Sequence, residues 1–142
     1  MPIQETGQLK FVEHPFLKEE NKDKWTSHPP VIPTALFTQN MRVRFVSGHT
    51  ESMMLPQLQY KGRTIVYMAD LLPSAGHVPL PYVMAYDMFP LTTINEKTSF
   101  LMEAQQNDYV LFFEHDPKIE CCTLHLTEKG IRLKESFDLK SL

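Results

Sequence analysis

The sequence lacks the features that mark several classes of protein. Its only two cysteines are adjacent, at positions 121 and 122, so they provide no disulfide framework. No apolar run approaches the roughly 18 residues needed to cross a bilayer. The net charge of −3 provides no basic surface for nucleic acid, which also argues against nuclease activity. The stretch MPIQETGQLK has no basic segment followed by an apolar one, so we predict no signal peptide and a cytoplasmic location.

The composition that remains is that of a soluble globular protein, with 42% hydrophobic and 22% charged residues in a chain of 142. This length suits one domain or part of a larger one. Residues 1–40 contain the charged stretch KEENKDKW and the proline-rich SHPPVIPTALF, which predict an irregular lead-in. The folded part is therefore expected to span residues 41–142.

The first half of this region has the pattern of strands. In MRVRFVSG, starting at residue 41, apolar residues alternate with arginines, which predicts a half-buried strand. MMLPQLQY and RTIVYMAD flank the dipeptide Lys61-Gly62 and predict a hairpin, with Pro56 near an edge or a bulge. YVMAYDMFP is compatible with a short helix that ends at Pro90.

The second half combines a helix with further strands. Thr93 and Glu96 form a capping box that predicts a helix over 93–108, and YVLFF predicts a strand buried on both faces. A hairpin across Glu128-Lys129-Gly130 closes the chain. We therefore predict an α/β fold of the α+β type, a mixed β-sheet covered by a helix on one face. Strands buried on both faces need more cover than this chain supplies.

Three of the apolar segments end at a side chain that can bind metal: His49, Asp70 and His115. Ligands gather in the crevice beyond the carboxyl ends of strands, and two imidazoles with a carboxylate suit zinc, iron or manganese. Each position taken alone is more often an ordinary loop residue. Gly48 permits a close backbone approach before His49, and Asp116 can act as an acceptor beside His115.

The segment CCTLH is a weaker candidate for a metal site. On a strand, Cys121 and His125 share a face but stand roughly 13 Å apart at about 3.3 Å per residue, so they cannot chelate one ion. We interpret this segment as strand packing.

The motifs GHT (48–50), MADLLPS (68–74) and EHDP (114–117) together resemble the C-terminal half of a metallo-β-lactamase-fold hydrolase. The resemblance implies one half of an αββα sandwich over residues 41–142. It also implies that His49 is a ligand of the first metal, that Asp70 bridges both metals, and that His115 is a ligand of the second. Ala69 stands where the family commonly has glycine before the aspartate, and Glu51-Ser52 where it has Pro-Gly.

The largest departure from the family concerns its N-terminal motif His-x-His-x-Asp-His, which this sequence lacks. Only His14 and His28 precede His49, and they are far apart. With three ligands, this chain alone is expected to hold zinc, iron or manganese weakly or not at all, where the full-length family holds two ions.

The missing half also predicts an uncovered sheet face. That face is expected to include some of Val43, Phe45, Ile65, Tyr67, Leu111 and Phe113. Exposed apolar faces of this kind mark interfaces, so we predict pairing with an N-terminal half or with a second copy of the chain.

The family resemblance implies a small-molecule ester, lactone or similar substrate. It also implies that His77 and Tyr82 are candidate substrate-binding residues near the substrate cleft, with Tyr86 at the mouth of the same cleft. Three hypotheses remain open. The chain is a truncated or split metal-dependent hydrolase, a catalytically incomplete dimeric structural or binding module, or a fragment of a longer protein whose other ligands are encoded upstream.

Overall fold

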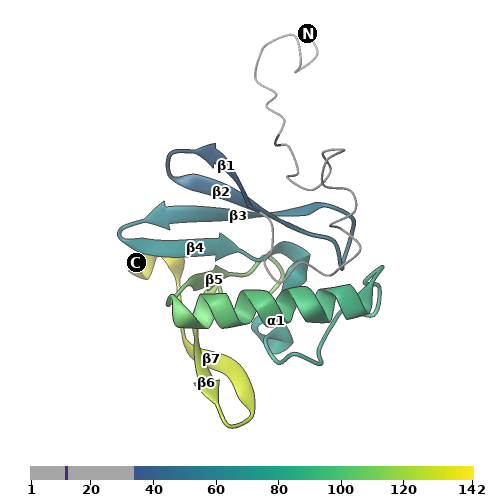
Figure 1. The fold of residues 1–142 in the computed structure, drawn as a ribbon. Coiled ribbons are helices and arrows are strands. Elements are labelled where there is room, and N and C mark those ends of the chain that lie inside the picture. The colour runs from purple at the N-terminus through teal and green to yellow at the C-terminus, as the bar shows by residue number, and fades with distance from the viewer. Residues whose placement is uncertain (1–11, 13–33) are drawn as a thin grey trace.

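A computed structural model describes residue 12 and residues 34–142 of the chain. Its seven strands form one sheet in sequence order, and only the β4–β5 pair is parallel. The strands are β1 (Thr34–Thr38), β2 (Met41–Val46), β3 (Met53–Tyr60), β4 (Arg63–Tyr67), β5 (Val110–Phe112), β6 (Cys121–Thr127) and β7 (Gly130–Phe137). The helix α1 spans Pro90–Gln106, and the short 3₁₀ turns are η3 (Ala69–Leu71), η4 (Ala75–His77) and η5 (Leu139–Ser141). Figure 1 shows α1 running across the sheet, with the β6–β7 hairpin projecting beyond it.

Strand β1 lies inside the stretch that was predicted to be irregular, so the prediction is wrong for residues 34–38. Four of its five residues are exposed, and the strand is held by pairing with β2 at the edge of the sheet. An edge strand that buries so little leaves no alternating apolar pattern in the sequence. His14 and His28 lie outside the described residues.

The β3–β4 hairpin confirms its turn prediction. Lys61 and Gly62 have φ values of 49° and 75° in the two-residue loop, as a type I′ turn requires. Pro56 lies on an interior strand and is opposite Val43 of β2, but the ladder with β4 begins only at Gln57. The proline thus occupies a position where β3 has a paired neighbour on one side, as its missing N–H favours.

Helix α1 corrects two predictions. Residues 82–89 are irregular, with a turn at Ala85 and Tyr86, and do not form a short helix. Pro90 begins the long helix at its first turn, where a missing N–H costs nothing. Thr93 is therefore inside the helix and is not its N-cap. Glu96 does not close a capping box, because its carboxylate binds the backbone after β2 instead.

The core lies between α1 and one face of the sheet. Phe100, Leu101 and Ala104 of the helix are fully buried against Val66 of β4 and Leu111 of β5. A mixed seven-stranded sheet with one covering helix confirms the predicted fold class.

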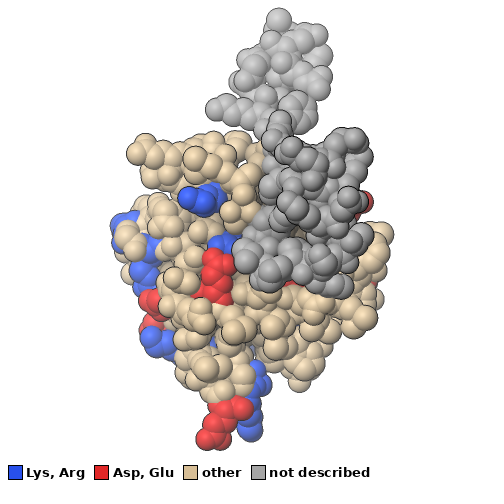
Figure 2. Space-filling view, in the orientation of Figure 1, with Lys and Arg blue, Asp and Glu red and all other residues tan. Residues whose placement is uncertain are grey.

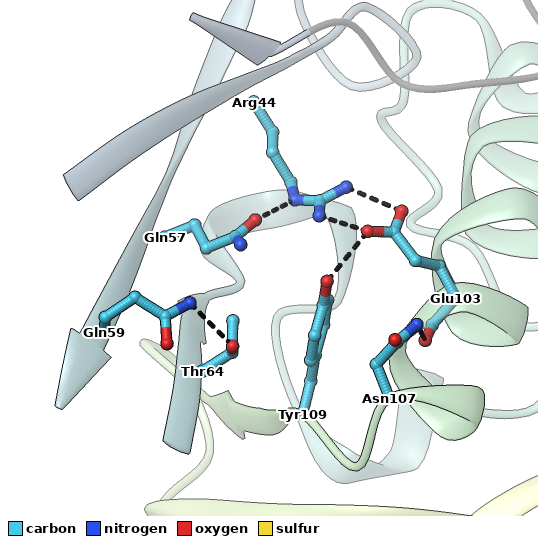
Figure 3. A network of polar contacts seen from close by, with 7 residues as sticks. All are labelled: Arg44, Gln57, Gln59, Thr64, Glu103, Asn107 and Tyr109. Carbon is cyan, nitrogen blue, oxygen red and sulfur yellow. Dashed lines mark hydrogen bonds and ion pairs between the residues drawn. The ribbon is translucent and has the colours of Figure 1, made fainter. Parts of the chain in front are cut away.

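Arg44 was expected on the polar side of β2 but is buried under α1, with 3% of its surface exposed. Figure 3 shows its guanidinium between sheet and helix, where Nε donates to Gln57 at 2.5 Å and the terminal nitrogens donate to both oxygens of Glu103. The rings of Phe100 and Tyr109 lie 5.6 and 5.8 Å from the guanidinium carbon. This bidentate pair fixes α1 on the sheet.

The predicted uncovered face is smaller than expected. Leu111 and Phe113 belong to the core under α1, and Ile65 is buried in a second cluster with Phe137 and Leu139 near the C-terminus. Val43 and Phe45 are also buried, whereas Tyr67 is half-buried. Partly exposed apolar side chains on the face away from α1 are Met54, Leu58 and Tyr60.

The charged side chains of both signs are interspersed on the face drawn in Figure 2, along one side and at the tip of the β6–β7 hairpin. Within the described residues, none of the helices has the length and apolar character needed to cross a membrane. The cytoplasmic location stays a prediction.

Candidate metal centre

The turn that carries His49 is held by helix α1. The carboxylate of Glu96 accepts the backbone N–H groups of Ser47 at 2.6 Å and Gly48 at 3.0 Å. Gly48 lies against the helix so closely that a Cβ there would be 2.2–2.5 Å from atoms of Thr93, two of them backbone atoms. Burial raises the pKa of Glu96 to about 7, although the two amides oppose that shift.

Asp70 and His115 are brought together because β4 and β5 are parallel neighbours, so the carboxyl ends of both strands lie at the same edge of the sheet. The Met68 N–H donates to the carbonyl of Phe112 at 2.9 Å, and the His115 N–H donates to the carbonyl of Pro73 at 3.1 Å. Asp70 lies in η3, directly after β4.

The two histidines face different oxygens of the same carboxylate. His49 Nε2 lies 3.5 Å from Asp70 Oδ2, and His115 Nε2 lies 3.4 Å from Asp70 Oδ1. Two ligands that each lie about 2.0–2.2 Å from one zinc ion at a tetrahedral angle are about 3.3–3.6 Å apart. Each histidine–oxygen pair therefore has the spacing of two ligands that share an ion.

No single point within the described residues is surrounded by three or more His, Cys, Asp or Glu side chains that could hold a metal ion. The imidazoles of His49 and His115 lie at opposite oxygens of Asp70, so each ion position would receive one nitrogen and one oxygen from this part of the chain. The donor set fits metal ions, but as two incomplete shells joined by a carboxylate.

Ala69 has a φ of +40°, in the left-handed region that glycine reaches without steric cost. The strained residue stands directly before Asp70 at the start of η3, and it is buried in the core.

A second carboxylate contacts His49 from the other side. Asp87 Oδ1 lies 2.9 Å from His49 Nδ1, and Asp87 Oδ2 accepts the N–H of Met84 at 3.3 Å. The sequence did not single out Asp87. The apolar stretch around it suggested a short helix, and no spacing relates it to His49.

A cavity of about 400 Å³ beside the candidate ligands is lined by His77, His115 and Tyr86 among others. The Oγ of Ser74 lies 2.9 Å from His77 Nδ1, and burial with the nearby charge of Lys97 lowers the pKa of His77. Tyr86 also meets the His49 ring edge-on, at 6.1 Å between centroids. The structure does not bring Tyr82 into this cavity, and its side chain is 60% exposed.

Lys97 organises the backbone near the cavity. Its fully buried amine donates to the carbonyls of Pro79, Leu80 and Tyr82, at 3.2, 3.3 and 2.6 Å. Burial lowers its pKa to about 8. The sequence contained a signal for this role, because Lys97 occupies the apolar stripe of α1 with Thr93 and Phe100.

The cysteines are confirmed as strand packing. Both are buried free thiols, and burial raises the pKa of Cys121 to about 11 and that of Cys122 to about 12. His125 is exposed on the same strand. The CCTLH segment takes no part in the site.

No protein-family model matches the sequence, and no curated protein matches it significantly. Solved structures do match the fold. AidC, a dizinc quorum-quenching lactonase in complex with a product, is 17% identical with a TM-score of 0.66 over 94% of this chain. A probable metal-dependent hydrolase from Staphylococcus aureus is 21% identical with a TM-score of 0.61 over 74% of this chain. AbOPH, a hydrolase in the β-lactamase superfamily, is 18% identical with a TM-score of 0.63 over 73%.

These matches define the class of the fold. The chain has the fold of the C-terminal half of a metallo-β-lactamase-fold hydrolase, as its motifs indicated. It spans 39%, 40% and 37% of the length of the Staphylococcus aureus protein, AidC and AbOPH, respectively.

Proposed function

We propose that this chain supplies one half of the metal centre of a hydrolase that works by metal-activated water. The observation that carries the proposal is the pair of contacts at Asp70, whose two oxygens lie 3.5 and 3.4 Å from the Nε2 atoms of His49 and His115. That arrangement suits a carboxylate that bridges two ions, as the motifs implied.

Two imidazoles and a carboxylate suit zinc, and also iron or manganese. In the proposed centre His49 would hold the first ion, His115 would hold the second, and Asp70 would contribute an oxygen to each. The ions, when bound, would supply Lewis acidity and an activated water. The chain's own residues hold the geometry, since Glu96 fixes the His49 turn and the β4–β5 pairing fixes the other two ligands.

The remaining ligands would come from a second half, which is either a separate N-terminal half or another copy of the chain. Two observations support pairing. The described residues hold only one nitrogen and one oxygen for each ion, and the solved structures with this fold are more than twice as long as the part that matches. Met54, Leu58 and Tyr60 would be covered by the partner.

The substrate we propose is a small ester or lactone that enters the cavity beside His115. AidC, which shares the fold, is a lactonase. The cavity of about 400 Å³ and the polar pair of Ser74 and His77 suit a compact molecule with an apolar part and an oxygen to be held. His77 remains the proposed substrate-binding residue, and Tyr82 could reach the substrate only from outside this cavity.

Zinc titration of the purified chain tests the metal proposal. Weak saturable binding is expected, and His49→Ala, Asp70→Ala and His115→Ala should each weaken it. His125→Ala removes an exposed histidine outside the site and should change nothing. If Asp70→Ala binds zinc as tightly as the wild type, the proposed centre is wrong.

The alternative is a catalytically incomplete dimeric module that keeps the fold for structure or binding. The incomplete shells around Asp70 favour it, because each ion position receives only two ligands from the described residues. Light scattering combined with metal analysis separates the two. A stable dimer without saturable zinc binding supports the module, whereas zinc binding that depends on Asp70 supports the hydrolase half. A monomer at all concentrations would exclude pairing with itself.

A further inference from the structure

Asp87 is a buried carboxylate that is neither one of the proposed metal ligands nor part of the cavity lining. Its side chain is 1% exposed, and both of its oxygens have partners. One faces His49 Nδ1 at 2.9 Å, and the other accepts the N–H of Met84 at 3.3 Å.

The chemistry of this contact determines which nitrogen of His49 carries the proton. An ionised carboxylate can only accept hydrogen bonds, so Nδ1 must be the donor in this pair. In the neutral imidazole, Nε2 then keeps its lone pair, and Nε2 is the atom that lies 3.5 Å from Asp70. A histidine binds metal through the nitrogen that carries no hydrogen.

The backbone holds Asp87 and His49 in register. The Met88 N–H donates to the carbonyl of His49 at 3.2 Å, and the Phe89 N–H donates to the carbonyl of Gly48 at 2.8 Å. Two main-chain bonds thus join the segment after Asp87 to the turn of His49. These main-chain hydrogen bonds hold the Asp87 carboxylate beside His49, so its position does not depend on a flexible surface contact.

We propose that Asp87 is a positioning residue that fixes His49 in the tautomer with a free Nε2, so that this half-chain presents its first metal ligand already oriented. The metal role of His49 rests on the function proposed above, but the tautomer is a property of the metal-free chain. A carboxylate behind a ligating imidazole typically changes metal affinity about 10–100-fold when it is lost.

The test is Asp87→Asn, which keeps the shape but replaces one oxygen by an NH₂ group. If the amide oxygen stays with the Met84 N–H, the NH₂ donates to His49 Nδ1 and forces the hydrogen onto Nε2. If the amide is turned over, its oxygen still accepts from His49 Nδ1, but two donors then meet at Met84. Only the first orientation keeps the Met84 hydrogen bond, so we expect the variant to adopt it and to disfavour the tautomer that binds metal. Asp138→Asn, at an exposed position far along the chain, removes the same charge and serves as control.

The tautomer is measured by ¹⁵N NMR of the metal-free chain at a pH where the imidazoles are neutral, and zinc affinity is measured separately. The wild type should carry its hydrogen on Nδ1 of His49, Asp87→Asn should shift it to Nε2, and zinc affinity should fall about 10–100-fold. Asp138→Asn should match the wild type in both measurements.

Two results would overturn the proposal. One is a wild-type His49 with its hydrogen on Nε2, which requires no variant to fold. The other is a folded Asp87→Asn chain that keeps the wild-type tautomer. If the tautomer shifts as expected but the wild type binds no zinc, the positioning role stands and the proposed metal function fails.

Discussion

Gly48 is the residue on which the position of His49 depends most directly. Its missing side chain lets the turn after β2 lie against Thr93 of α1, and the Phe89 N–H then reaches its carbonyl. The requirement is for space, because any Cβ would meet the helix backbone.

We therefore expect Gly48→Ala to destabilise the chain by about 2–4 kcal/mol, since backbone atoms of Thr93 cannot move away cheaply. Gly76→Ala is the matched control, because its Cβ would have only Ser74 Oγ nearby, at 3.5 Å. Urea unfolding of both variants measures the difference. Equal stabilities would contradict the packing described for Gly48.

Glu96 predicts a dependence of stability on pH. Its pKa rises from 4.5 in the unfolded chain to about 7 in the folded one, chiefly through burial. The folded state therefore holds a proton that the unfolded chain has released, so this stability is complete below about pH 4.5 and is lost as pH rises through about 7.

Glu96→Gln cannot titrate, so comparison with the wild type isolates this effect. From pH 4.5 to 7.5 the wild type should lose on the order of 3 kcal/mol relative to the variant. Urea unfolding across this range measures it. A flat difference for Glu96→Gln would show that the carboxylate is not buried as described.

At the residue scale, the sequence singled out the three candidate ligands but not the residues that contact them. His49, Asp70 and His115 stand at strand ends, where motifs are visible, and the structure brings all three together. Asp87 lies in an irregular segment, and its contact with His49 depends on tertiary folding alone. Glu96 looked like half of a capping box because its spacing from Thr93 fits that motif equally well.

At the scale of elements, helix α1 organises two loops through adjacent residues of opposite charge. Glu96 binds the amides before His49, and Lys97 binds three carbonyls of the loop from Pro79 to Tyr82. Both loops border the candidate site. One turn of the helix therefore fixes the backbone position of the turn that carries His49 and of the loop from Pro79 to Tyr82.

Lys97→Met keeps the apolar stem but removes the amine, which leaves three carbonyls without their donor. We expect a loss of about 1–3 kcal/mol and faster hydrogen exchange in residues 79–86. Lys134→Met, at an exposed position of β7, should leave both unchanged. Unchanged exchange in Lys97→Met would contradict the organising role.

Arg44 anchors the same helix to β2. Arg44→Met should cost about 2–4 kcal/mol, because Gln57 and Glu103 lose a bidentate partner at a buried position. Arg42→Met is the matched control on the same strand, where the arginine is exposed and a change within about 0.5 kcal/mol is expected. Thermal unfolding of both variants shows whether the loss of stability comes from the buried position of Arg44 or only from the loss of one positive charge.

The elements that bury an apolar pattern were predictable, and those that do not were missed. The β3–β4 and β6–β7 hairpins carried turn residues between alternating runs, and both are present. Strand β1 is exposed, and residues 82–89 contain apolar side chains that stay at the surface, such as Tyr86 and Met88. In such segments, composition does not report burial.

At the scale of the whole molecule, the described residues form a sheet and helix with a sizeable core, and the proposed metal ligands lie at one end of the sheet. The face away from α1 keeps apolar side chains at the surface, although fewer than the sequence suggested, because the C-terminal residues bury Ile65. Both the exposed surface and the shared carboxylate of Asp70 are what a second half would complete.

The most direct measurement is anomalous diffraction from crystals of the chain soaked in zinc well above the affinity found in solution. We expect a zinc ion about 2.0–2.2 Å from a carboxylate oxygen of Asp70 and from Nε2 of His49 or His115. Zinc bound only elsewhere, at the exposed His125 for example, with no ion at Asp70, would contradict it.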